Sequence, residues 1–241
     1  MNSTAIQENI NKYFPLLSEV RKRLIFVLSI FLTSGVLGFF YYEKIIVFIL
    51  KLLDLEGVNI VFTSPFQFLN LAVSSSLLIG TIITIPILIY QILTFLKPAL
   101  RVSEYRSVIA FLPLSILLFL GGFTFGFLMM KYVVAVFYSK SVELNIGNML
   151  DISKLLSQIL VTASLMGLAF QYPIVMSLLM KFKVVAYETF VKQRPIAYVI
   201  AILFAALMPP TDILSLILLT LPLIVLFELT LLLNKIYSKM R

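Results

Sequence analysis

The segment Leu69–Leu96, with the sequence LNLAVSSSLLIGTIITIPILIYQILTFL, contains no charged residue. The hydrocarbon core of a bilayer is about 30 Å thick, and a helix needs about 20 mostly apolar residues to cross it. Five other stretches of the chain are similarly apolar and contain a single charged residue between them, Glu228. The sequence therefore predicts six transmembrane helices, at residues 24–42, 69–96, 107–130, 155–180, 195–209 and 213–234.

The composition of the chain points the same way. Its 241 residues are 61% hydrophobic with a mean hydropathy of +1.08, which excludes an ordinary soluble globular protein. No hydrophilic segment is long enough to fold separately, so we expect an all-α polytopic membrane protein with one domain, residues 1–241. The absence of cysteine and histidine excludes disulfides and the usual transition-metal ligands, and we predict no metal and no cofactor.

Lysine and arginine residues are distributed unequally between alternate loops. Both terminal segments and the second and fourth loops together carry fourteen, whereas the first, third and fifth loops carry five. Because positive charge favours the cis side of a membrane, we expect both termini there, in the cytoplasm or stroma. Topology and anionic lipid headgroups explain the net charge of +8, so nucleic acid is not an expected partner.

Several features predict departures from a bundle of straight helices. The fifth span, 195–209, is short for a full bilayer at about 1.5 Å per residue. On the trans side, 43–56 is expected to form an interfacial helix and 131–154 a polar loop, which together make a cap. The GxxxG pair Gly122 and Gly126 favours close packing within the chain over a dimer interface. Kinks are expected at Pro86, Pro113 and Pro173.

Two acidic residues lie among cations in the predicted cis segments. Glu19 precedes the basic residues 21–23, which a membrane flank explains, whereas a carboxylate there can bind a cationic peptide group. Glu104 is the only acid of the second loop. Two interpretations of Glu104 stay open: an ion pair with Arg101 or Arg106, or a bidentate site for a guanidinium ligand.

Three further polar residues lie in or beside the later spans. Gln171 predicts either an interhelical hydrogen bond or a polar patch that attracts water or a substrate. Glu228 is a functional candidate as an intramembrane carboxylate, although its nearness to Asn234 and Lys235 also permits a structural role. Asp212 is favoured as the N-cap of the sixth span.

The chain contains no nucleotide-binding loop, nucleophile elbow or zinc motif, so no enzyme is predicted. A small-solute or ion secondary transporter is the alternative to consider, because of the prolines within spans and Glu228. Against it, the sequence shows no internal repeat of the kind that transporters have.

Seven short motifs identify a resemblance to a known family. In chain order they are SEVRKRL (18–24), SPF (64–66), FLKPALRVSEYR (95–106), FQYP (170–173), KQRPIAY (192–198), MPPTDILS (208–215) and LPLIVLFE (221–228). Together they resemble TatC, the receptor subunit of the twin-arginine protein translocase, over nearly the whole chain.

The resemblance implies a receptor for twin-arginine signal peptides, at the core of a translocase that exports folded proteins using the proton gradient. It implies TatA-type and TatB-type single-span partners, twin-arginine precursors as cargo, and a homo-oligomeric complex without a cofactor. It also implies a curved bundle with short fifth and sixth helices. The composition favours a plastid thylakoid membrane, with a bacterial plasma membrane as the alternative.

The resemblance also implies roles for individual residues. The signal-peptide site would comprise Glu19, Arg21, Phe95, Pro98 and Glu104. The trans-side turn would comprise Pro209, Pro210 and Asp212, and a partner groove would lie around Leu207, Met208 and Phe227. Many family members carry glutamate where this chain has Gln171, which cannot titrate, so a proton-linked role there is doubtful.

Overall fold

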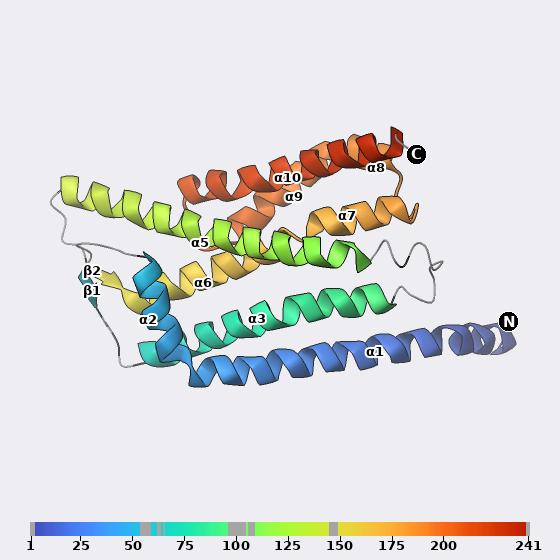
Figure 1. Ribbon diagram of the computed structural model, residues 1–241, viewed down its shortest axis with the longest axis horizontal. Coiled ribbons are helices and arrows are strands. Elements are labelled where there is room, and N and C mark those ends of the chain that lie inside the picture. Colours follow the sequence, from blue (N-terminus) through green and yellow to red (C-terminus); the bar gives the residue numbers. More distant parts are fainter. Residues whose placement is uncertain are drawn as a thin grey trace.

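The computed structural model describes residues 3–53, 59–61, 64, 66–95, 105, 109–144 and 149–239. These residues form a bundle of helices with one very small parallel sheet (Figure 1). The helices are α1 (Ser3–Phe40), α2 (Tyr42–Leu53), α3 (Gln67–Phe95), α5 (Phe111–Glu143), α6 (Ile152–Ala169), α7 (Tyr172–Lys181), α8 (Tyr187–Lys192), α9 (Arg194–Ala206) and α10 (Ile213–Lys239). The strands are β1 (Asn59–Val61) and β2 (Met149–Asp151).

Five apolar segments are long enough to cross a membrane, so the chain is a polytopic helical protein. They are Ser18–Phe40, Gln67–Ile92, Phe111–Glu143, Ser153–Lys181 and Ile213–Ile236. The sixth predicted span corresponds to α10, which has 27 residues, so the expectation of a short sixth helix is wrong. The fifth corresponds to α9, which has only 13 residues, and its crossing of the membrane stays a prediction.

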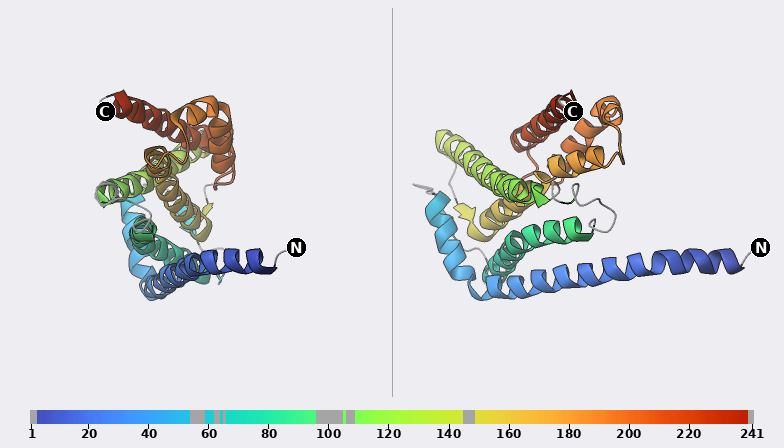
Figure 2. Two further views of the ribbon diagram at one scale, coloured as in Figure 1. Left: turned by 90° about the vertical axis from the view of Figure 1, so that its right-hand side faces the viewer. Right: turned by 45° about the vertical axis from the view of Figure 1, so that its right-hand side comes forward.

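Small residues allow α1 and α3 to lie side by side along much of their length (Figures 1 and 2). A Cβ atom placed on Gly38 would lie 2.9 Å from the Ile79 Cβ, and one placed on Gly80 would lie 2.9 Å from the Phe31 ring. These distances are shorter than any normal contact. The two helices therefore approach closely because glycine occupies these positions, as in other membrane helix pairs.

The predicted GxxxG pair packs within the chain, against α6. A Cβ on Gly122 would lie 2.6 Å from the Met166 carbonyl oxygen, and one on Gly126 would lie 2.9 Å from the Ala163 Cα. The preference for packing within the chain is thus confirmed. Gly121, the neighbouring residue, faces open space, since a Cβ placed on it would meet nothing within 4 Å.

The end of the bundle opposite the chain termini is closed by α2 and the small sheet (Figure 1). The expected helix in 43–56 is present, because α2 buries Ile46, Ile49 and Leu53 on one face. β1 pairs with β2 in parallel, with Asn59 opposite Met149, so the first and third connecting segments are joined as the predicted cap requires.

The predicted polar loop at 131–154 is wrong over most of its length. α5 continues to Glu143, because Val133 and Val134 are buried and a Lys140–Glu143 ion pair of 2.6 Å supports its last turn. The Lys131 ammonium also donates to the Leu52 carbonyl at the end of α2, at 3.2 Å. The long α5 is therefore linked to the C-terminal end of α2 by a hydrogen bond.

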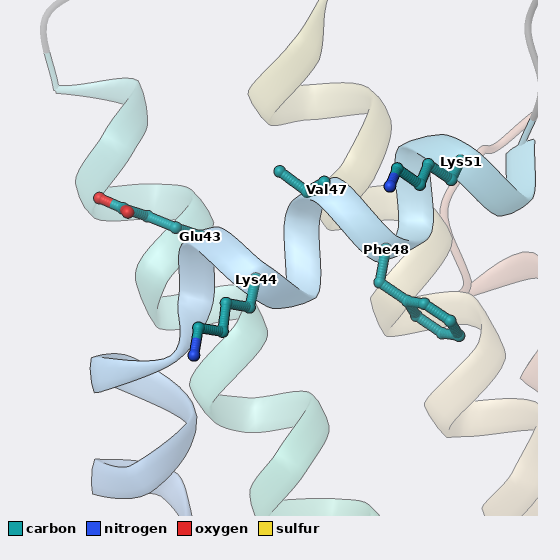
Figure 3. A pocket seen from close by; sticks show the side chains of 5 residues that line it. All are labelled: Glu43, Lys44, Val47, Phe48 and Lys51. Atoms are coloured by element: carbon teal, nitrogen blue, oxygen red, sulfur yellow. The ribbon is translucent and has the colours of Figure 1, made fainter.

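The outward face of α2 carries Glu43, Lys44, Val47, Phe48 and Lys51 around a shallow hollow (Figure 3). All five side chains that line the hollow come from α2 itself. Because no second element from the described part of the chain lines it, we assign no ligand to this hollow.

The three prolines that predicted kinks behave differently. Pro86 lies inside the continuous helix α3. Pro113 lies in the first turn of α5, where the N–H that it lacks would have no helical partner, so the prediction of a kink within a span is wrong there. Pro173 follows a real interruption, because the fourth span is divided into α6 and α7 at residues 170–171.

Candidate functional site

The first polar cluster connects α1 to the last turns of α3. We call Glu19, Arg23, Gln91 and Phe95 the α1–α3 cluster. The Glu19 Oε1 accepts hydrogen bonds from the Arg23 Nε at 3.1 Å and from its Nη2 at 2.7 Å. The Arg23 Nη1 donates to the Gln91 backbone oxygen at 3.0 Å and to its Oε1 at 2.8 Å. The Arg23 guanidinium carbon lies 5.9 Å from the centre of the Phe95 ring.

The α1–α3 cluster lies toward the end of the bundle where both chain termini are found (Figure 1). The Glu19 side chain is 40% exposed, whereas that of Arg23 is 23% exposed. Arg21, another predicted site residue, is exposed on the same helix. The arrangement therefore presents a carboxylate at the surface, with a guanidinium held behind it.

Two of the predicted site residues, Pro98 and Glu104, lie outside the described residues. Their segment begins directly after Phe95, the last residue of α3 and a member of the α1–α3 cluster. The two interpretations of Glu104 therefore both stay predictions.

The second polar position, Gln171, lies at the junction between α6 and α7. Its Oε1 accepts a hydrogen bond from the Ser115 Oγ at 2.7 Å, and its Nε2 donates to the Ser115 backbone oxygen at 3.1 Å. The Nε2 also approaches the Gly167 backbone oxygen at 3.4 Å. Since Ser115 is fully buried, the amide holds α5 against the interrupted span, which is the interhelical bond that the sequence predicted as one alternative.

Replacing Gln171 by leucine is expected to destabilise the protein by about 1–3 kcal/mol, because it leaves the buried Ser115 hydroxyl without its acceptor. The double variant Gln171→Leu with Ser115→Ala should recover most of this loss, since both polar partners are then removed together. Thermal unfolding of the wild type, Gln171→Leu, Ser115→Ala and the double variant in detergent measures the difference. Additive losses in the double variant would contradict a direct bond between the two side chains.

The third polar position is Glu228 on α10. Its Oε2 accepts a hydrogen bond from the Arg194 Nη2 at 2.9 Å, and its Oε1 accepts one from the Tyr198 hydroxyl at 2.6 Å. The structural role that the sequence permitted is therefore present, but with partners on α9. The neighbouring Asn234 instead donates to the Ser177 hydroxyl of α7 at 3.0 Å.

The predicted N-cap at Asp212 is confirmed. Its Oδ1 accepts from the Ser215 backbone N–H at 2.8 Å, and its Oδ2 from the Ser215 hydroxyl at 2.6 Å. Just before it, the Pro209 carbonyl accepts a hydrogen bond from the Thr162 hydroxyl, and Pro210 is half-buried. The short turn between α9 and α10 is thus fixed to α6 and to the first turn of α10.

Of the three residues expected around a partner groove along the last two spans, only one is exposed. Met208 is 1% exposed and Phe227 is 7% exposed, because both fill the packing around α9 and α10. Leu207 is 84% exposed. The prediction that Met208 and Phe227 line an open groove is therefore wrong.

Several residues that complete these sites were missed from the sequence. Gln91, like Gln171, is an amide within a predicted span, whereas Ser115 is one of several hydroxyl residues in its span and gave no such signal. Arg194 and Tyr198 lie four residues apart, so they face the same side of a helix, and this spacing was a usable signal for a shared partner.

These polar groups are suited to binding a ligand through charge and hydrogen bonds. Carboxylates bind guanidinium and ammonium groups, and an amide or a hydroxyl binds through hydrogen bonds. Within the described ranges, no group of three or more acidic side chains is placed to hold a metal ion. The exposed carboxylate of the α1–α3 cluster is therefore the strongest candidate for binding a cationic ligand.

Comparison with known proteins gives one consistent result. A family model described as "Sec-independent protein translocase protein (TatC)" matches residues 15–222. TatCy of Bacillus subtilis is 31% identical over 225 residues, covering 91% of this chain and 87% of the relative. TatC of Aquifex aeolicus is 31% identical over 231 residues, covering 92% and 94%.

Two solved structures share the fold. A crystal structure of the "Twin Arginine Translocase Receptor- TatC in DDM" aligns with a TM-score of 0.80 and 31% identity, covering 90% of this chain and 98% of that one. A second structure of the twin-arginine translocase receptor TatC aligns with a TM-score of 0.74 and 29% identity, covering 92% of this chain and 99% of that one.

Proposed function

The chain belongs to the TatC family of Sec-independent protein translocase proteins, and from this premise we propose that it is the receptor for twin-arginine signal peptides. It is an integral membrane protein and a component of the Tat protein translocase. As the core of that complex, it passes folded precursor proteins across the membrane at the expense of the proton gradient.

The observation that carries the receptor role is the exposed Glu19 carboxylate in the α1–α3 cluster. One oxygen of this carboxylate already accepts two hydrogen bonds from the guanidinium of Arg23, so the group is placed where a guanidinium can bind it. Arginine binds carboxylates through a planar fork of N–H donors that lysine does not have. A pair of arginines in a signal peptide therefore has a matching group at this surface.

A second carboxylate completes the proposed site. Glu104 follows Phe95 by nine residues, and an extended chain of that length reaches at most about 30 Å. We propose that Glu104 takes one of the two ligand arginines and Glu19 the other. The proposed site also includes Arg21, Phe95 and Pro98.

The proposed orientation places both termini on the cis side, with α9 as the fifth of six crossings. The unequal distribution of lysine and arginine supports it, and both termini lie at one end of the bundle (Figure 1). The turn of Pro209, Pro210 and Asp212 then lies on the trans side. The relatives reported above are bacterial, which favours a bacterial plasma membrane and gives the plastid thylakoid no support.

The proposed partners are TatA-type and TatB-type single-span subunits in a homo-oligomeric complex, together with twin-arginine precursors. A role in moving protons is not assigned to Gln171, because its amide does not titrate and is used in holding Ser115. The transporter alternative rested on the prolines within spans and on Glu228, and both oxygens of that carboxylate are engaged by Arg194 and Tyr198.

A photocrosslinker at position 104 tests the receptor role. With a purified precursor that carries an Arg-Arg signal, we expect crosslinks that disappear when the pair is changed to Lys-Lys. A crosslinker at Phe48, which is exposed on α2 at the other end of the bundle, should label neither precursor. Equal labelling of the two precursors from position 104 would contradict the proposed function.

A further inference from the structure

We infer that Arg23 occupies the Glu19 carboxylate in the free protein and that a signal-peptide arginine must displace Arg23 in order to bind there. Arg23 thereby helps to set the specificity of the site. This inference rests on the proposed receptor function. It assigns a role to an arginine of the receptor that is distinct from the roles of the two arginines of the ligand.

The hydrogen bonds of Arg23 fill one oxygen of Glu19. A carboxylate oxygen has two lone-pair directions, and the Glu19 Oε1 accepts both the Nε and the Nη2 of Arg23, at 3.1 and 2.7 Å. Among the described residues, no other side chain bonds to this carboxylate. The second oxygen, Oε2, is therefore the one that a ligand can reach while Arg23 stays in place.

This occupancy affects the discrimination between arginine and lysine. The fork-to-fork geometry that distinguishes arginine needs one N–H on each carboxylate oxygen. A ligand limited to Oε2 makes a single charge-assisted bond, which a lysine ammonium can make equally well. Selective binding of arginine at Glu19 therefore requires Arg23 to release Oε1.

Gln91 can keep the Arg23 guanidinium bound after Arg23 releases Glu19. The Arg23 Nη1 is already bound to the Gln91 backbone oxygen at 3.0 Å and to its Oε1 at 2.8 Å, and the guanidinium lies over the Phe95 ring. Arg23 is also the less exposed of the ion pair, at 23% against 40% for Glu19. Arg23 can therefore release Glu19 while its guanidinium stays hydrogen-bonded to Gln91 of α3. The ligand arginine then binds Glu19 from the solvent side.

Binding of a fluorescent Arg-Arg signal peptide to the purified full-length protein in lipid nanodiscs tests this exchange, with a Lys-Lys peptide measured in parallel. Arg23→Gln removes the internal competitor, so the Arg-Arg peptide should bind about fivefold more tightly. Lys22→Gln removes the same charge from an exposed neighbour on α1 and should change the affinity less than about twofold.

Gln91→Leu should have the opposite effect to Arg23→Gln. It leaves the Glu19–Arg23 pair intact but removes the side chain that receives Arg23, so the Arg-Arg peptide should bind about two- to threefold more weakly. If Gln91 and Arg23 served only to hold Glu19 in position, both variants would weaken binding. The opposite signs are therefore specific to displacement.

Weaker or unchanged binding by Arg23→Gln would overturn the inference, as would an equal gain from Lys22→Gln. If Arg23→Gln does not fold, unchanged or tighter binding of the peptide by Gln91→Leu still overturns the displacement. A wild-type protein that does not prefer Arg-Arg over Lys-Lys would instead overturn the proposed function itself. The two failures are thus distinguishable in one experiment.

Discussion

Glu19→Lys is expected to lower the affinity for an Arg-Arg signal peptide by at least about thirtyfold, or roughly 2 kcal/mol. The variant removes a carboxylate that is able to take a ligand arginine and puts an ammonium in its place. That ammonium lies beside Arg23, so the ligand then meets two like charges. The loss should exceed the gain expected from Arg23→Gln, because the attractive group itself is gone. Peptide binding in nanodiscs measures both variants on the same scale.

Glu188→Lys is the matched control for this charge reversal. Glu188 is exposed in the first turn of α8, outside the α1–α3 cluster, and the substitution changes the net charge by the same amount. We expect less than about a twofold change in affinity from it, since solvent and salt screen exposed charges at a distance. A similar loss from both variants would show that the ligand responds only to overall charge, and Glu19 would then lose its proposed role.

Gly122→Leu is expected to destabilise the bundle by about 3 kcal/mol or more, at the upper end of the cost of overpacking. Even the first atom of the new side chain would lie 2.6 Å from the Met166 carbonyl oxygen and 2.6 Å from the Phe170 ring. The carbonyl belongs to the backbone of α6 and cannot move without moving that helix. The two helices must therefore separate, and their contacts along α5 and α6 are lost. Unfolding in mixed detergent micelles measures the change.

Gly121→Leu is a control that differs only in the direction of the side chain. A Cβ at Gly121 meets nothing within 4 Å, so leucine there extends away from the neighbouring helices. We expect a change within about 0.5 kcal/mol, as for other substitutions at open positions. Equal destabilisation by the two leucines would mean that the loss of stability arises within α5 itself rather than from its packing against α6.

Much of the fold follows from local properties of the sequence. Segments such as Leu69–Leu96 must form helices in a bilayer, because only a helix satisfies the backbone hydrogen bonds of a single span internally. The cap at Asp212 and the helix α2 depend on residues within a few positions of each other, and both are confirmed, whereas the position of α2 at the membrane interface stays a prediction. The prediction failed where the signal was hydropathy alone, at 131–154, because buried valines continue α5 beyond the most apolar stretch.

The sequence alone determined that this chain is a helical membrane protein with an acidic group near the start of its first span. Only the tertiary structure decided which polar groups meet. Gln91 lies 68 positions from Arg23, and Ser115 lies 56 positions from Gln171. Glu228 binds Arg194, 34 positions away. A polar group in an apolar environment requires a partner, but the identity of the partner depends on how helices are aligned against each other. Glycine contacts between helices contribute to that alignment, and the GxxxG pattern predicts close packing at Gly122 and Gly126 without specifying which helix packs there.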